Sequence, residues 1–223
     1  MSIAVRYHGQ CIGETPSFLI RNGLQPINFV LRTTTLLIAL LATAGLLTGC
    51  DQSGMGGPEP TTCTAPLTAL NNSGVSGQAT VTVEGSQLTV NVDAQGTEGP
   101  LHAQHIHGFA NDASSCPTAA ADTSGNGRIS VGEGASSYGG ILVPLDGSLD
   151  NAEGLGDLDT FPTGGSDGDY SYERTIMTGD LDVNKDKSFE DLSLANHAIV
   201  VHGRTVEGEY APKLPVACVT LAR

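Results

Sequence analysis

The chain has 223 residues and a formal net charge of −14, because 24 Asp and Glu residues outnumber 10 Lys and Arg residues. A surface with this excess of carboxylates repels the phosphates of DNA and RNA, which excludes nucleic acid as a partner. Carboxylates also attract divalent cations, so metal ions remain candidate partners. The length suffices for one domain with its own hydrophobic core.

An apolar run at residues 36–47 is followed by the sequence TGC, which ends at Cys50. This run is too short to span a membrane as a helix but is typical of the apolar region of a signal peptide. The ending LTGC resembles the lipobox of bacterial lipoproteins, which implies that Cys50 is the lipid-modified first residue of the mature chain. We therefore expect residues 1–49 to be a signal peptide. A start at residue 30 or 31 would be more ordinary, so it stays open whether residues 1–29 are translated.

The mature chain is predicted to be exported and held by its lipid on a bacterial membrane, facing the periplasm or the cell exterior. Gly, Pro and polar residues predict a flexible tether, so the lipidated cysteine and tether occupy residues 50–63 and the folded domain residues 64–223. Export permits a disulfide, but spacing alone does not decide which cysteines pair. The candidates within the mature chain are Cys63, Cys116 and Cys218.

Short runs rich in Val, Thr and Leu, separated by Gly-containing turns, predict an all-β domain. Eight strands of this kind favour an eight-stranded antiparallel Greek-key barrel or sandwich. No stretch after the signal peptide shows a sustained helical period with caps, so no helix is expected. The predicted strands are residues 65–70, 78–83, 87–92, 101–107, 141–145, 170–177, 198–202 and 216–221. Two long connections, residues 108–140 and 146–169, interrupt them, and loops of this length are usually functional or disordered.

Histidines cluster in the sequence HAQHIHG. Side chains alternate along a strand with a period of two, so His105 and His107 share one face. Two imidazoles on one face can bind a metal ion if a third ligand joins them, and His202 in the apolar run HAIVVHG is the best candidate. The alternative, that these histidines only pack or form hydrogen bonds in a β core, stays open.

These segments, together with the C-terminal PVACVTL, resemble the copper/zinc superoxide dismutases. The resemblance implies an eight-stranded Greek-key barrel in which His105, His107 and His202 bind copper. It also implies a disulfide between two cysteines and a histidine that supports the ligands from the other strand face. Those residues are Cys116, Cys218 and His102. Three neutral imidazoles suit both Cu(II) and Cu(I), and the implied activity is dismutation of superoxide.

The chain departs from this family where zinc would bind. The position of the bridging histidine is occupied by Asp122, and the loop that follows has no histidine, so a zinc site like the family's is absent. The arginine that attracts superoxide in the family is replaced by Pro215, for which Arg204 or Lys213 could substitute. The zinc-free, copper-only members of the family imply that copper chemistry does not require the bridging histidine.

A second resemblance gives an alternative function. HIHG followed by GGILVPL is similar to the CHRD domain of chordin-type and bacterial secreted proteins. This resemblance implies a non-enzymatic binding module at the cell surface. The paired cysteines favour the dismutase-like interpretation, whereas the missing zinc ligands favour the CHRD-like one.

Residues 122–133 read DTSGNGRISVGE and match the twelve-residue calcium loop of EF hands. Oxygen atoms at alternate positions face a hard cation, and glycine at the sixth position allows the tight turn. The predicted calcium ligands are Asp122, Ser124, Asn126, Arg128 through its backbone carbonyl, and Glu133. Pro117 and Gly134 bracket the loop, so we expect a calcium loop without EF-hand helices. The alternative is an ordinary Gly/Asn loop.

A weaker copy of the calcium pattern lies at residues 182–193, with Asp182, Asn184 and Asp186 in the first three ligand positions. Lys187 replaces the glycine of the pattern and Ser193 its last carboxylate, so a solvated acidic turn is the favoured interpretation. The first calcium-type loop occupies the place of the zinc loop of the dismutases. We hypothesise that calcium orders this connection in place of zinc.

Overall fold

The structure is a computed structural model, and it describes residues 60–109, 113–147, 149, 156–180 and 197–221, with the backbone of Gln10–Ile12. The predicted lipidation site and the second calcium-type loop therefore lie outside the described residues. They comprise Cys50, Asp182, Asn184 and Asp186.

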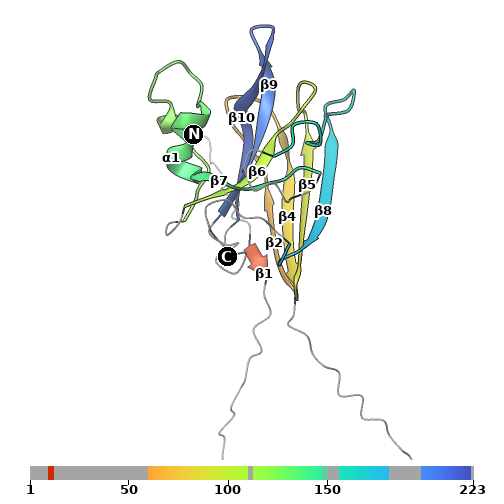
Figure 1. The fold of residues 1–223 in the computed structure, drawn as a ribbon. Helices are drawn as coiled ribbons and strands as arrows, with labels where there is room; N and C mark the ends of the chain where they lie inside the picture. Colours follow the sequence, from red (N-terminus) through yellow and green to blue (C-terminus); the bar gives the residue numbers. More distant parts are fainter. Residues whose placement is uncertain are drawn as a thin grey trace, which may run out of the picture. The chain divides into compact units, whose positions relative to one another are not determined.

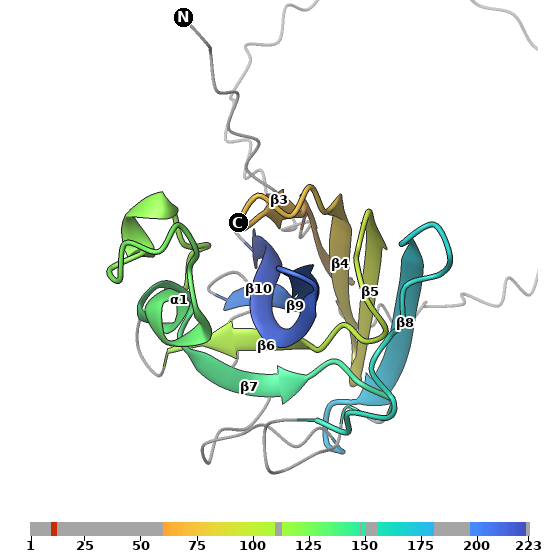
Figure 2. The ribbon, with the colours of Figure 1, turned by 90° about the horizontal axis from the view of Figure 1, so that it is seen from above.

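Two five-stranded antiparallel sheets form in the full chain, and β1, at the edge of the first, lies within the predicted signal peptide (Figure 1). The first sheet has the order β1 (Gln10–Ile12), β2 (Thr61–Pro66), β4 (Ser76–Glu84), β5 (Gln87–Gln95), β8 (Tyr170–Met177). The second has the order β3 (Thr68–Ala69), β10 (Glu209–Leu221), β9 (His197–Val206), β6 (Gln104–Gly108), β7 (Gly140–Pro144). Figure 2 shows β6 beside β7, and β4, β5 and β8 beside one another.

The core lies between the two sheets. Along β4 and β5 buried and partly exposed residues alternate, as expected for strands with one face on a core. Val81 and Val90 from the first sheet belong to the same buried cluster as Ile199 and Val219 from the second. Burying each such side chain stabilises the fold by about 1.5–3 kcal/mol, so the cluster holds the two sheets together.

The predicted all-β class is confirmed, and the sheets form a sandwich that does not close into a barrel. Seven of the eight predicted strand regions each overlap one strand, whereas the region 65–70 divides between β2 and β3, which belong to different sheets. The last two strands are longer than predicted, because a tight turn at Glu207 and Gly208 joins them as a hairpin. The sequence does not predict this hairpin, because Lys213 and Pro215 interrupt the apolar pattern. The register of β10 against β9 also shifts in this region.

The prediction that the domain has no helix is wrong. A 3-10 helix, η1 (Ala119–Ala121), precedes the calcium-type loop, and α1 (Val131–Tyr138) follows it. The helix was missed because its eight residues, VGEGASSY, are rich in Gly and Ser and too short to show a period. Its start signal was present, since Ser130 and Glu133 form a capping box. Within the described residues, no helix is long and apolar enough to cross a membrane.

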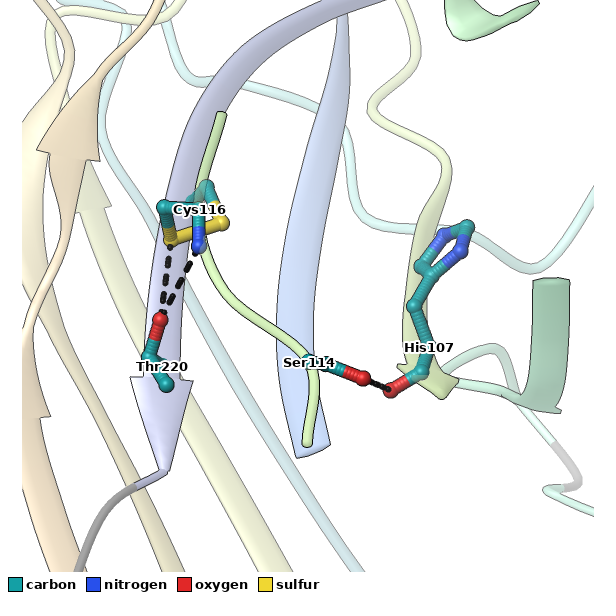
Figure 3. The surroundings of a disulfide bond; sticks show 5 residues. His107, Ser114, Cys116 and Thr220 are labelled. Atoms are coloured by element: carbon teal, nitrogen blue, oxygen red, sulfur yellow. Dashed lines mark hydrogen bonds between the residues drawn. A yellow bond between two sulfur atoms is a disulfide. The ribbon is translucent and has the colours of Figure 1, made fainter. Parts of the chain in front are cut away.

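The disulfide implied by the family resemblance is present between Cys116 and Cys218. It ties the connection after β6 to β10 across a sequence separation of 102 residues. Thr220 reinforces the junction, because its Oγ1 accepts a hydrogen bond from the Cys116 backbone N–H at 3.1 Å (Figure 3). The start of the long connection is thus fixed to the second sheet.

Removing this disulfide should destabilise the domain strongly. A Cys116→Ala/Cys218→Ala double variant should lose about 2–5 kcal/mol of unfolding free energy, because a long loop in the unfolded chain is no longer closed. Urea unfolding of the oxidised protein and the variant measures the difference. Thr220→Val, which keeps the disulfide and removes only the hydroxyl, should cost about 1 kcal/mol. Equal losses for the two variants would contradict this account.

Candidate metal centre

Three histidines from two neighbouring strands of the second sheet come close together. His105 and His107 lie on β6, and His202 lies on β9, which pairs with β6. Each offers one ligand nitrogen, and the three nitrogens lie within 4.8 Å of one another. All three side chains are buried, with exposures of 5%, 2% and 4%. We call these residues the histidine trio. In the part of the chain that the structure describes, no other group of three metal-binding side chains comes this close.

Backbone carbonyls fix the orientation of two of the three rings. His107 Nδ1 lies 3.1 Å from the carbonyl oxygen of Gly139, and His202 Nδ1 lies 2.9 Å from that of Lys213. A carbonyl can only accept, so each Nδ1 carries the proton and each Nε2 keeps a lone pair for a metal ion. The Nε2 of His107 is buried and has no hydrogen-bond partner. A bound metal ion would satisfy this otherwise costly atom.

Two members of the trio, His107 and His202, are held in the neutral form that binds metals. Burial, and then the nearby rings of His202 and His105, hold the pKa of His107 well below its usual value. Burial is also the main cause that lowers the pKa of His202 to about 3. Neutral imidazole is the ligand form, so these residues need not lose a proton to bind a metal ion near neutral pH.

His102, for which the resemblance implied a supporting role, lies just before β6 and contacts the backbone of His202. It is fully buried, and its Nδ1 lies 3.2 Å from the backbone carbonyl oxygen of His202. Its ring stacks on Tyr170 at a centroid distance of 5.6 Å, which fixes the imidazole plane. Burial lowers its pKa. His102 thus holds the backbone that carries His202 and is not a member of the trio.

Two aromatic residues that the sequence analysis did not identify pack on the trio. The ring centroid of Tyr138, at the end of α1, lies 4.6 Å from the ring centroid of His107. The ring centroid of Phe161 lies 5.4 Å from the ring centroid of His105. Tyr138 lies in the first long connection and Phe161 in the second. The unusual length of these connections is the sequence feature that indicates a functional role for them. Periodicity could not place them, because neither lies on a strand.

The segment between β6 and the disulfide is also joined to the site. The Ser114 hydroxyl lies 3.5 Å from the backbone oxygen of His107, and Cys116 follows two residues later (Figure 3). The two candidate substitutes for the missing arginine are Arg204 and Lys213, and this role stays a prediction. Arg204 donates to the carbonyl oxygen of Asn71 at 2.7 Å, and Lys213 contributes its backbone oxygen to His202.

The predicted calcium loop folds around its own two carboxylates. The carboxylate of Asp122 accepts backbone N–H groups, among them that of Gly127 at 2.7 Å. The carboxylate of Glu133 accepts the backbone N–H of Ser124 at 2.9 Å and that of Ser130 at 2.8 Å. Hydrogen bonds from Ser130 are the main cause that lowers the pKa of Glu133 to about 2. Glu133 is therefore ionised at neutral pH. Calcium at this loop stays a prediction.

Likeness to known proteins is found among solved structures, and it is distant. No family model matches the chain, and no curated protein matches it. Among solved structures, the chain is similar to the Cu/Zn superoxide dismutase from Brucella abortus, with 18% identity and a TM-score of 0.41. The match covers 72% of this chain and 99% of that chain. A likeness this distant carries no functional argument, so the assignment below rests on the geometry of the trio.

The metal-free domain should lose stability as the pH falls below 6.5. The folded-state pKa values of His102, His107 and His202 lie below the ordinary value of 6.5, so the unfolded chain binds more protons in this range. Each histidine lowers the free energy of unfolding by up to about 1.4 kcal/mol per pH unit. Urea titrations at about pH 7 and about pH 5 measure the loss. His107→Gln removes one titrating group and should lose less over the same range, and an equal loss would contradict the assignment.

Proposed function

We propose that this domain binds one copper ion through His105, His107 and His202. The observation that carries the proposal is the convergence of three buried ligand nitrogens within 4.8 Å. The chemistry of the donor set agrees, because imidazole nitrogen suits copper in both oxidation states. The orphaned Nε2 of His107 supports a cation at this position.

We further propose that the site dismutates superoxide. Copper, when bound, would supply reversible one-electron chemistry. In the overall reaction one superoxide gives up its electron and leaves as dioxygen, and a second takes that electron and two protons to become hydrogen peroxide. The protein holds the imidazoles in place through Gly139, Lys213 and His102. Burial of the trio keeps bulk water away from the ligands.

Export and membrane attachment are proposed together. The support for attachment is the lipobox-like LTGC at Cys50. The disulfide between Cys116 and Cys218 supports an oxidising compartment, because such bonds are rare in the reducing cytosol. The alternative, a non-enzymatic CHRD-like module at the cell surface, keeps only the sequence resemblance in its favour.

Copper titration of the purified, metal-free protein tests the copper site. The protein should bind one equivalent of Cu(II), with nitrogen hyperfine structure in the EPR spectrum. His202→Ala should weaken binding at least about tenfold, because it removes one of three ligands. His197→Asn is the matched control, since His197 is equally buried on the same strand but is not in the trio.

A superoxide-decay assay on the same samples separates binding from turnover. Catalysed decay that disappears in His202→Ala and persists in His197→Asn would support dismutation. Nitrogen-bound copper without catalysed decay would make the domain a copper-binding protein only. Failure to bind copper at a defined stoichiometry would refute the copper site and leave the calcium-stabilised binding module as the better account.

We also propose that calcium binds the loop of residues 122–133. The support is the spacing of the ligand-type residues, together with the approach of Asp122 and Glu133 to the same short loop. Gly127 has a φ of 78° at the sixth position, where the calcium loop requires a residue that tolerates this conformation. Calcium would order the connection that leads into α1, and α1 ends beside His107.

Calcium should stabilise the metal-free protein. At a free calcium concentration about 100-fold above the dissociation constant, the gain in unfolding free energy should be about 2.7 kcal/mol. Asp122→Asn and Glu133→Gln should each reduce this gain, whereas Asp167→Asn, in a different loop, should keep it. Urea unfolding with calcium or with a chelator measures the difference. An unfolding curve that calcium does not move would remove the proposal.

A further inference from the structure

Phe161 covers the histidine trio on the side of His105. Its side chain is 3% exposed, and its ring meets the imidazole of His105 edge to face, with an interplanar angle of 73°. It lies in the connection between β7 and β8, which crosses from the second sheet to the first (Figure 1). No backbone hydrogen bond of a strand holds this part of the chain. Its position must therefore come from hydrogen bonds and packing other than those of a strand ladder.

A buried carboxylate organises the connection ahead of Phe161. Asp146 is fully buried, and its two oxygens accept the backbone N–H groups of Leu149 at 2.9 Å and Asp157 at 2.7 Å. The carbonyl oxygen of Asp157 then accepts the backbone N–H of Thr160 at 3.0 Å and closes a tight turn. The residue after this turn is Phe161. The hydrogen bonds of Asp146 and Asp157 thus fix the backbone just before Phe161. They place the Phe161 ring beside the trio.

Two further contacts fix the ring in place. The backbone oxygen of Pro162 accepts the N–H of His102 at 2.8 Å, which ties the residue after Phe161 to the segment leading into β6. Gly156 has a φ of 79°, and a Cβ atom at this position would lie 2.4 Å from Cζ of Phe161. Only glycine leaves room for the ring here. The connection is therefore shaped to hold an aromatic side chain against His105.

The same connection carries a charge of one sign. Residues 146–169 contain no Lys, Arg or His. The described part of the connection contains the carboxylates of Asp146, Asp157, Asp159, Asp167 and Asp169. Like charges repel an approaching anion, and the repulsion is screened by salt. The cover over His105 is thus an apolar ring on an acidic segment.

We propose that Phe161 is the specificity-determining residue of the trio: its ring closes the His105 side, and its acidic connection discriminates against anions. The site then admits metal cations and small neutral molecules more readily than anionic ligands. This inference rests on the proposed copper site and adds a limit on what reaches it. Entry of the superoxide anion then limits the rate of the proposed dismutation, and it becomes faster when the ring is removed.

Acylation of metal-free protein by diethyl pyrocarbonate tests the cover without copper. This neutral reagent modifies accessible imidazole nitrogen, and mass spectrometry of peptides reports each histidine separately. Phe161→Ala should speed acylation of His105 about tenfold or more, because a buried group reacts only when its cover opens. Leu158→Ala is the matched control, since Leu158 lies in the same connection but is 61% exposed. Its rate should stay close to that of the wild type.

The rate at His197 serves as the internal reference for general loosening of the fold. His197 is buried on β9 but is not in the trio. Faster acylation of His105 together with an unchanged rate at His197 supports the cover. An unchanged rate at His105, or equal increases at both histidines, overturns it. If Phe161→Ala does not fold, Phe161→Leu replaces it, and a smaller increase confined to His105 is then expected.

Azide binding to the copper-loaded protein tests the discrimination against anions. Azide affinity, read from its absorption band with Cu(II), should rise about tenfold in Phe161→Ala and remain unchanged in Leu158→Ala. In the wild type, the azide association rate should increase with salt, since screening weakens repulsion by the acidic connection. Wild-type affinity equal to that of Phe161→Ala overturns the assignment. Absence of bound copper refutes the proposed function instead, while the acylation test of the cover still stands.

Discussion

The pairing of β6 with β9 is the constraint on which the metal centre depends. His105 lies opposite Val200, and the N–H of His202 donates to the carbonyl oxygen of Ala103. A slip of one residue would turn every side chain of β6 to the other face and separate the ligands. Both strands are internal to their sheet, between β7 and β10, so hydrogen bonds on both sides specify their register. The position of the trio is thus set by backbone geometry.

Orientation of the rings is set by carbonyl groups from other segments. The oxygen of Gly139 lies just after α1, and that of Lys213 lies within β10. Each fixes the proton on Nδ1 and leaves Nε2 for a ligand. Burial of several neutral imidazoles lowers the stability of the metal-free fold in acid, and a bound cation would offset part of the desolvation. The buried histidines therefore reduce the free energy of unfolding of the metal-free protein in acid.

Both long connections meet the trio, one at each of the β6 ligands. The connection between β6 and β7 is tied down by the disulfide at Cys116 and ends with Tyr138 against His107. The connection between β7 and β8 is organised by Asp146 and places Phe161 against His105. In the first, the calcium-type loop precedes α1, so an ion bound there would act on the helix that contacts the site. The two connections thus shape the surroundings of the ligands while the strands hold them.

The sequence by itself determined the all-β class, the strand regions and the trio, because a period of two and an apolar run ending in His202 are local signals. The family resemblance added the pairing of Cys116 with Cys218, which spacing left open. The hairpin of β9 and β10 and the helix α1 were missed, since Pro215 breaks the apolar pattern and eight Gly-rich and Ser-rich residues show no period. Only the tertiary structure decided that the sheets stay open and that Tyr138 and Phe161 cover the ligands. Those contacts join residues far apart in the chain through packing, which leaves no periodic trace in the sequence.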